Sequence, residues 1–133
     1  MRVVVDTNVL LSAILFGGTP GRILDAWRAG KVELVMSPDI VEEYVRVGER
    51  LNERYSDVEI QPIVALLVQN ATIVPDTPLP GPVCDDPDDD KFLACALASG
   101  TDIVVSGDKK LRAVSGYEGV HVLTPRQFAD RWL

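Results

Sequence analysis

Two carboxylates stand directly after apolar segments that have the composition of buried strands. Asp6 follows the apolar run 3–5, and Asp108 lies a short turn beyond the apolar run 103–105. Open α/β sheets place their binding crevices at the carboxyl ends of their strands. Acids at these two positions are therefore candidates to meet in one crevice, where carboxylates can bind a cation or transfer protons.

A third group of acids lies between them in the sequence. Five aspartates fall within six residues: Asp85, Asp86, Asp88, Asp89 and Asp90. The formal net charge of −7 argues against a simple electrostatic grip on nucleic acid, which needs clustered Lys and Arg. Acids packed this tightly repel one another unless a cation neutralises them. A divalent metal would do so, and net charge is then a poor guide to the partner.

Helical periodicity separates the neighbouring acids Glu42 and Glu43. The helix expected over residues 38–55 has an apolar stripe formed by Ile40, Tyr44, Val47 and Leu51. Glu42 points almost opposite to this stripe, whereas Glu43 lies at its edge. Glu43 is therefore the better candidate to reach a crevice, and Glu42 the better candidate for solvent.

The same count leaves one choice open in the aspartate-rich segment. At ~100° per residue, Asp90 shares a face of the helix expected over 87–99 with Leu93, Ala94 and Leu97. Asp89 also faces inward by this count. Periodicity alone does not choose between Asp89 and Asp90.

Each acid also has a purely structural explanation. Asp86 precedes Pro87 and is most simply a helix N-cap. Asp88 and Asp89 are acids of a first helical turn, where the helix dipole favours them. Aspartates after strands often form turns, and Glu43 taken singly could be a rim charge. Only the joint occurrence of the acids favours a site over these alternatives.

Three cations follow Asp108 closely, namely Lys109, Lys110 and Arg112. They either form a solvated helix face or contact an anionic substrate near the acids. The single histidine, His121, lies in a strand segment away from every acid and is expected to be structural.

Strand and helix signals alternate along the chain. Strands are expected at residues 3–5, 33–36, 72–74, 103–105 and 120–123, and helices at 9–16, 21–29, 38–55, 59–69, 87–99, 109–113 and 125–132. Three helices begin with a capping side chain before a proline, at Ser37, Asp86 and Thr124. The alternation predicts an α/β fold, a three-layer α/β/α sandwich with a central, mostly parallel five-stranded sheet. We expect a single domain over residues 1–133.

Composition fits an ordinary globular domain, with 47% hydrophobic and 25% charged residues. No apolar run reaches the ~18 residues of a membrane span, and the N-terminus lacks the apolar core of a signal peptide. We therefore expect a cytoplasmic protein. Cys84 and Cys95 have neither metal-site spacing nor a disulfide framework and are expected to be reduced thiols.

Taken together, these motifs resemble the PIN-domain family, in particular small prokaryotic members described as toxins of toxin–antitoxin pairs. The resemblance covers nearly the whole chain and rests on Val-Val-Val-Asp6-Thr7-Asn8-Val-Leu, Ser37-Pro38-Asp-Ile-Val-Glu-Glu43-Tyr, Asp86-Pro-Asp-Asp-Asp90-Lys-Phe-Leu-Ala-Cys-Ala, Val-Val-Ser106-Gly107-Asp108-Lys-Lys-Leu and Leu-Thr-Pro125-Arg-Gln-Phe. It implies a PIN-like fold with a catalytic acidic metal site formed by Asp6, Glu43, Asp90 and Asp108. Asn8 and Ser106 would be supporting polar residues, and Lys109 is a further candidate to contact the substrate.

The resemblance implies a metal-dependent ribonuclease. Carboxylate ligands without His or Cys suit Mg²⁺ or Mn²⁺, and a metal-activated water would hydrolyse an RNA phosphodiester bond without a covalent intermediate. An antitoxin protein and a homodimer are the implied partners. The alternative is a non-catalytic PIN-like protein that binds RNA or an antitoxin.

Two other enzyme classes fit the residues poorly. A phosphatase with an aspartate nucleophile would need a second acid where Asn8 stands. A receiver domain would need a phospho-accepting aspartate at the end of a central strand, whereas Asp57 lies in a polar stretch.

Overall fold

A five-stranded, entirely parallel sheet forms the centre of the computed structural model, which describes residues 1–133. Its strands are Arg2–Val5 (β1), Glu33–Met36 (β2), Thr72–Ile73 (β3), Ile103–Val105 (β4) and His121–Leu123 (β5). The β-branched runs of β1 and β4 are buried on both faces, which confirms the predicted central position of these strands.

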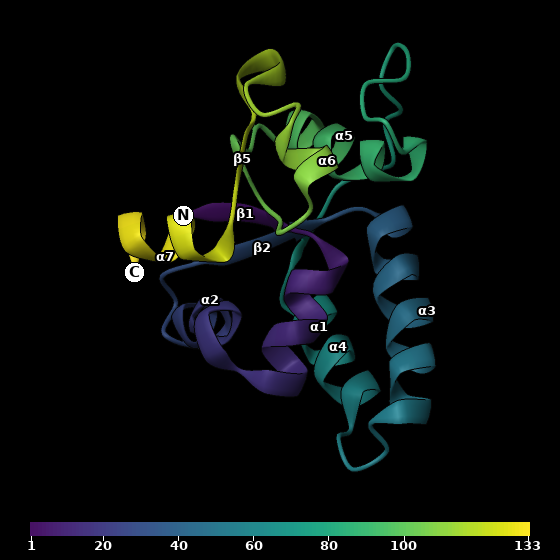
Figure 1. Cartoon of the computed structure of the whole chain (residues 1–133), viewed down its shortest axis with the longest axis vertical. Coiled ribbons are helices and arrows are strands. Elements are labelled where there is room, and N and C mark those ends of the chain that lie inside the picture. Colours follow the sequence, from purple (N-terminus) through teal and green to yellow (C-terminus); the bar gives the residue numbers. More distant parts are fainter.

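The helices form the two outer layers (Figure 1). They are Thr7–Phe16 (α1), Gly18–Arg28 (α2), Pro38–Arg54 (α3), Ile60–Gln69 (α4), Asp90–Ser99 (α5), Lys109–Arg112 (α6) and Pro125–Trp132 (α7), with short 3₁₀ turns at Pro87–Asp89 (η1) and Tyr117–Gly119 (η2). In Figure 1, α1 to α4 lie on one side of the sheet and α5 and α6 on the other. The predicted three-layer α/β/α fold is confirmed.

Strand order explains why the candidate acids can meet. The order is β3-β2-β1-β4-β5, so the chain first builds outward from β1 in one direction and then returns to the other side of β1. This reversal places the switch point of the sheet between β1 and β4, where α/β folds bind their ligands. The backbone amide of Asp6 donates to the carbonyl of Val105 at 2.9 Å, so the carboxyl ends of both strands lie side by side there.

The segment expected as one helix over 87–99 is divided in two. Asp86 accepts a hydrogen bond from the amide of Asp88 at 3.0 Å, which confirms its capping role, but it caps the 3₁₀ turn η1. The α-helix begins only at Asp90. Its buried residues are Phe92, Leu93, Cys95 and Ala96, whereas Leu97 is 37% exposed. Asp89 and Asp90, which precede this buried face, are both half-buried.

No single helix is long and apolar enough to cross a membrane. α1 and α2 have the required length and composition only when taken together, and a bend of 91° separates them. The bend falls at Gly17, whose φ of 69° is one that residues with a side chain rarely adopt.

Candidate active site

Ser106 connects the acids that follow β1 and β4. The carboxylate of Asp6 is buried, with 7% of the residue exposed, and its Oδ2 accepts a hydrogen bond from Ser106 Oγ at 2.6 Å. The same Oγ accepts from the backbone amide of Asp108 at 3.0 Å. Asp108 also caps α6, because its Oδ1 accepts from the amide of Lys110 at 2.9 Å. One hydroxyl thus fixes both strand-end acids relative to each other.

Glu43 reaches the same region from α3. It is buried, with 8% exposed, and its two carboxylate oxygens have different partners. Thr7 Oγ1 donates to Oε2, and Lys91 Nζ donates to Oε1 at 2.8 Å. Glu42 instead points outward and pairs with Arg46 at 3.0 Å. Glu43 therefore faces inward and Glu42 faces solvent, as the periodicity predicted.

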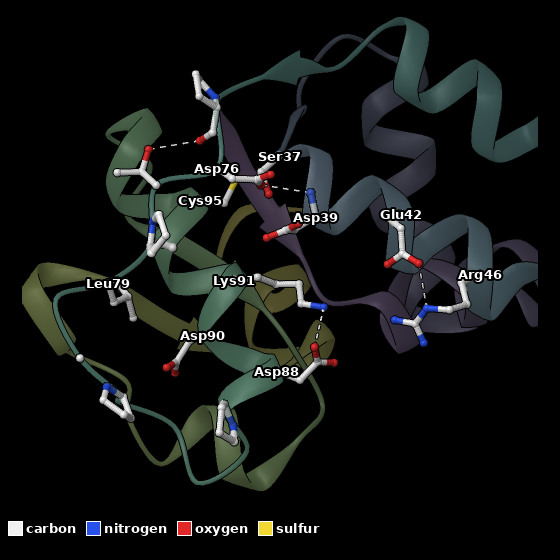
Figure 2. Close-up of a pocket in the computed structure, with 17 residues that line it drawn as sticks. Ser37, Asp39, Glu42, Arg46, Asp76, Leu79, Asp88, Asp90, Lys91 and Cys95 are labelled. Atoms are coloured by element: carbon white, nitrogen blue, oxygen red, sulfur yellow. Dashed lines mark hydrogen bonds and ion pairs between the residues drawn. The ribbon is translucent and has the colours of Figure 1, made fainter.

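The carboxylate of Asp90 is bound to the loop that precedes η1. Its Oδ1 accepts from the amide of Cys84 at 2.8 Å and its Oδ2 from the amide of Val83 at 3.2 Å, so both oxygens hold the preceding loop. Figure 2 shows the Asp90 carboxylate directed away from the Lys91 ammonium. The resemblance implies that Asp90 is a metal ligand, and in this structure both of its oxygens accept from loop amides.

Asp89, the other candidate that the helical count left open, lies near the strand-end acids. Its side chain lies close enough to Asp108 and Asp6 for their charges to act on it, and its Oδ2 is buried without a hydrogen-bond partner. η1 is a 3₁₀ turn, so the rotation per residue there differs from the ~100° of the helical count, which had left Asp89 and Asp90 open. We refer to Asp6, Glu43, Asp89 and Asp108 as the acidic cluster.

Few positive charges compensate the negative charges of the acidic cluster, although its carboxylates are wholly or partly buried. Desolvation, followed by the charges of Asp108, Asp6 and Asp86, raises the pKa of Asp89 to about 7. Desolvation also raises the pKa of Asp6, and the nearby charges of Glu43 and Asp108 add to this, although the hydrogen bond from Ser106 opposes it. Carboxyl groups with raised pKa values, and a buried oxygen without a partner, are features that a bound cation would stabilise.

Lys91 is the buried cation nearest to the cluster. Its side chain is 12% exposed and bridges Glu43 Oε1 at 2.8 Å and Asp88 Oδ1 at 3.0 Å. Burial alone would lower the pKa of Lys91, but the hydrogen bonds to Glu43 and Asp88 outweigh burial and raise it. The same hydrogen bond from Lys91 lowers the pKa of Asp88. Lys91 therefore forms an ion pair with Glu43 and a second one with Asp88.

The donor set of the cluster fits a hard divalent cation, because it offers only oxygen ligands. As the side chains stand, however, no three acids converge closely enough to share one ion. Like charges repel one another when no cation lies between them, and Ser106 and Lys91 hold two of the carboxylates. Binding of an ion therefore requires the carboxylates to turn toward it.

Two of the expected supporting residues lie at the edge of this region. Asn8 is exposed in the first turn of α1, and Lys109 is exposed in the first turn of α6. Ser106, by contrast, is fully buried against Asp6. Sequence reasoning missed Thr7 and Lys91. The spacing of Asp88 and Lys91, three residues apart in a helical segment, was the available signal for the ion pair.

A cavity of about 560 Å³ adjoins the acidic cluster (Figure 2). It lies between the start of α3, the proline-rich segment 75–82 and the start of α5. Its lining includes Asp88, Asp90 and Lys91, and Lys91 pairs with Glu43 of the cluster. Asp6, Asp89 and Asp108 are not among its lining residues. The cavity is therefore a neighbour of the site and does not contain its acids.

The chain is similar to known proteins both in sequence and in fold. Residues 2–110 match the sequence profile of a family described as PIN domain. A protein of Methanocaldococcus jannaschii, called uncharacterized protein MJ1680, is 31% identical over 145 residues, which cover 99% of this chain and 92% of that protein. The crystal structure of VapBC2 from Rickettsia felis, bound to a DNA fragment from their promoter, has a similar fold. The TM-score is 0.56 at 12% identity, over 93% of this chain and 98% of that one.

Proposed function

Because this chain belongs to the PIN-domain family, whose members are generally nucleases, we propose that it is a metal-dependent ribonuclease that hydrolyses RNA phosphodiester bonds. One observation supports this proposal above the others. Buried and half-buried carboxylates gather at the switch point of a parallel sheet, and one of them has a buried oxygen without a partner. Such an arrangement lowers stability unless a cation binds there.

We assign the metal to Asp6, Asp89 and Asp108, with Glu43 beside them. This assignment differs from the set that the resemblance implied, because both oxygens of Asp90 are engaged by the loop. Carboxylate oxygens select Mg²⁺ or Mn²⁺. Such an ion, when bound, neutralises charge on the phosphate and lowers the pKa of an attacking water.

The surrounding residues position the acids. Ser106 donates to Oδ2 of Asp6 and so fixes the orientation of this carboxylate. Thr7 and Lys91 fix the carboxylate of Glu43 from opposite sides. Lys109, exposed beside Asp108, is the cation through which an RNA phosphate would be drawn to the cluster.

The test is cleavage of labelled RNA by the full chain with Mg²⁺, with Mn²⁺ and with EDTA. Asp6→Asn and Asp89→Asn should each lower the rate by more than about 100-fold, because each removes a charged ligand. EDTA should stop cleavage. Cleavage that survives chelation or both substitutions would refute the proposal.

Asp90→Asn is the matched control, since it removes a neighbouring carboxylate that faces the loop instead. We expect it to keep most of the activity and to lower stability. If Asp90→Asn and not Asp89→Asn abolishes cleavage, the ligand assignment is reversed and the nuclease proposal stands.

We further propose that the chain is the toxin of a toxin–antitoxin pair. The support is the fold shared with VapBC2 of Rickettsia felis, together with the buried acids that a toxin nuclease requires. Expression of the wild type should arrest growth and expression of Asp6→Asn should not. Growth arrest by both would favour the non-catalytic alternative, in which the protein acts by binding alone.

We also propose a cytoplasmic homodimer. Ile63 and Leu66 are exposed on α4, at 36% and 50%, and Phe16 is 65% exposed at the end of α1. Exposed apolar side chains of this size favour association. Light scattering on the purified chain measures the mass, and a monomer at micromolar concentration would contradict the proposal.

A further inference from the structure

The charges around the acidic cluster fall into two groups. Glu43 and Asp88 are bound to the ammonium of Lys91 at 2.8 and 3.0 Å. Asp6, Asp89 and Asp108 have no cation within ion-pair distance. The first group is neutralised by the chain itself, and the second group is not.

Both oxygens of Glu43 are already occupied. Oε2 accepts from Thr7 and Oε1 accepts from Lys91. Asp89 presents the opposite case, because its Oδ2 is buried with no partner. Asp6 and Asp108 each have one oxygen that accepts a hydrogen bond, from Ser106 and from the amide of Lys110. An incoming ion would therefore find more unfilled oxygens on the side of Asp6, Asp89 and Asp108 than on the side of Glu43.

Lys91 is fixed in this place by its position in the fold. It stands in the first turn of α5, directly after η1, and its side chain extends across to α3 (Figure 2). Only 12% of the side chain is exposed, so the ammonium is largely shielded from water. Arg46, the other nearby cation, is 52% exposed, and its Nη2 stands 3.9 Å from Glu43 Oε1. Lys91 is thus the inner cation and Arg46 the outer one.

From these contacts we propose that Lys91 takes the place that a second metal ion has in two-metal nucleases, so that this chain binds a single divalent ion. Lys91 is a positioning residue in this scheme. It neutralises Glu43 and Asp88, and its charge repels any further cation from their oxygens. The inference rests on the proposed function, because it concerns the same acidic site.

The number of bound ions tests the inference without any activity measurement. The full chain is titrated with Mn²⁺, and binding is measured by calorimetry and by the electron paramagnetic resonance signal of free Mn²⁺. The wild-type chain should bind one ion. Lys91→Met should bind two, because Glu43 and Asp88 become available. The two ions should then show the spin coupling of a close manganese pair.

Two matched variants complete the experiment. Lys31→Met removes an exposed lysine that precedes β2 at the opposite edge of the sheet, and it should still bind one ion. Lys91→Arg keeps the positive charge and should also bind one ion. Circular dichroism verifies that each variant is folded.

The outcomes separate the inference from the function on which it rests. Two ions in the wild type, or a single ion in folded Lys91→Met, would overturn the inference and leave the nuclease proposal standing. If Lys91→Met does not fold, the wild-type count alone decides. Absence of any Mn²⁺ binding to the wild type would overturn the proposed function as well.

Discussion

The two ends of strand β1 carry charge in opposite ways. At its amino end, Arg2 pairs with Glu33 at 3.5 Å, and both side chains are about half exposed, at 46% and 49%. At its carboxyl end, Asp6 is 7% exposed and faces other carboxylates. The first arrangement is solvated and matched, whereas the second is buried and of one sign. The second arrangement is the one that the proposed metal site would need.

Addition of a divalent ion should change the stability of the folded state more than any of the substitutions below. The ion should act only at the carboxyl end of β1. At a Mn²⁺ concentration of about 100 times the Kd, binding stabilises the folded state by about 2.7 kcal/mol. For a chain of this size we expect Tm to rise by roughly 10 °C. Differential scanning calorimetry with Mn²⁺ and with EDTA measures the difference.

Asp89→Asn should abolish most of this rise, because it removes the buried oxygen that lacks a partner. Glu33→Gln, at the amino end, should leave the rise unchanged. Equal Mn²⁺ stabilisation in wild type and Asp89→Asn would show that the ion binds elsewhere.

Ser106→Ala should have the next largest effect, because Ser106 bonds to both strand-end acids. Loss of a buried hydroxyl that satisfies a carboxylate costs about 1–3 kcal/mol of unfolding free energy. The affinity for Mn²⁺ should fall by about 10–100-fold, since Asp6 loses the group that orients it. Urea unfolding and Mn²⁺ titration measure the two effects.

Ser99→Ala is the matched control for this variant. Ser99 Oγ donates to the carbonyl of Cys95 at 2.8 Å at the far end of α5. Its removal should affect stability and leave Mn²⁺ affinity unchanged. If both variants lower the affinity equally, Ser106 acts through general stability and does not orient Asp6.

Much of the fold could be predicted because local signals and burial agree. The apolar runs at β1 and β4 can satisfy their side chains only inside a parallel sheet, and they lie there. Ser37 and Thr124 cap α3 and α7 with the bonds that their sequence positions predicted. The strand-end location of Asp6 and Asp108 follows from the same signals.

The choice between Asp89 and Asp90 could not be made from periodicity. A count of 100° per residue assumes an α-helix from its first turn, and Pro87–Asp89 is a 3₁₀ turn instead. A family resemblance assigns roles by aligned sequence position, and it does not take a local change from α-helix to 3₁₀ turn into account. The loop amides of Val83 and Cys84, which engage Asp90, also come from outside the helix.

The partners of Glu43 were equally invisible in the sequence. Thr7 and Lys91 are 36 and 48 residues away from it along the chain. Contacts of this kind exist only after α1, α3 and α5 have packed around the end of the sheet. Sequence patterns predict which face of a helix is buried, but they do not predict which polar side chain it meets there.

Without bound metal, a change of pH should alter the free energy of unfolding through the acids at the carboxyl end of β1. This effect should be smaller than those described above. The pKa of Asp89 is about 7 in the folded state against an ordinary value of 3.8, so the folded state binds the proton more tightly than the unfolded state. Stability from this group is therefore present at low pH and is lost as pH rises toward 7. Because Asp89 is partly solvated, the loss should be on the order of 1 kcal/mol between pH 5 and pH 8.

Urea unfolding in EDTA across this pH range measures the loss, and Asp89→Asn should remove most of it. The acids that face Asp89 from the other elements are Asp6, Asp86 and Asp108. The pKa of Asp6 is also raised, so a small slope should remain in the variant. A slope that is unchanged in Asp89→Asn would place its origin elsewhere.

Of all these changes, Glu33→Gln at the amino end of β1 should have the smallest effect on stability and on Mn²⁺ binding. The substitution removes the charge that pairs with Arg2 but keeps an oxygen able to accept from Thr72. Exposed ion pairs contribute little because water and salt screen them. Tm, Mn²⁺ affinity and RNA cleavage should all match the wild type within error. A clear loss of Mn²⁺ affinity in Glu33→Gln would mean that charge acts along the whole of β1, and the contrast between its two ends would no longer identify the site.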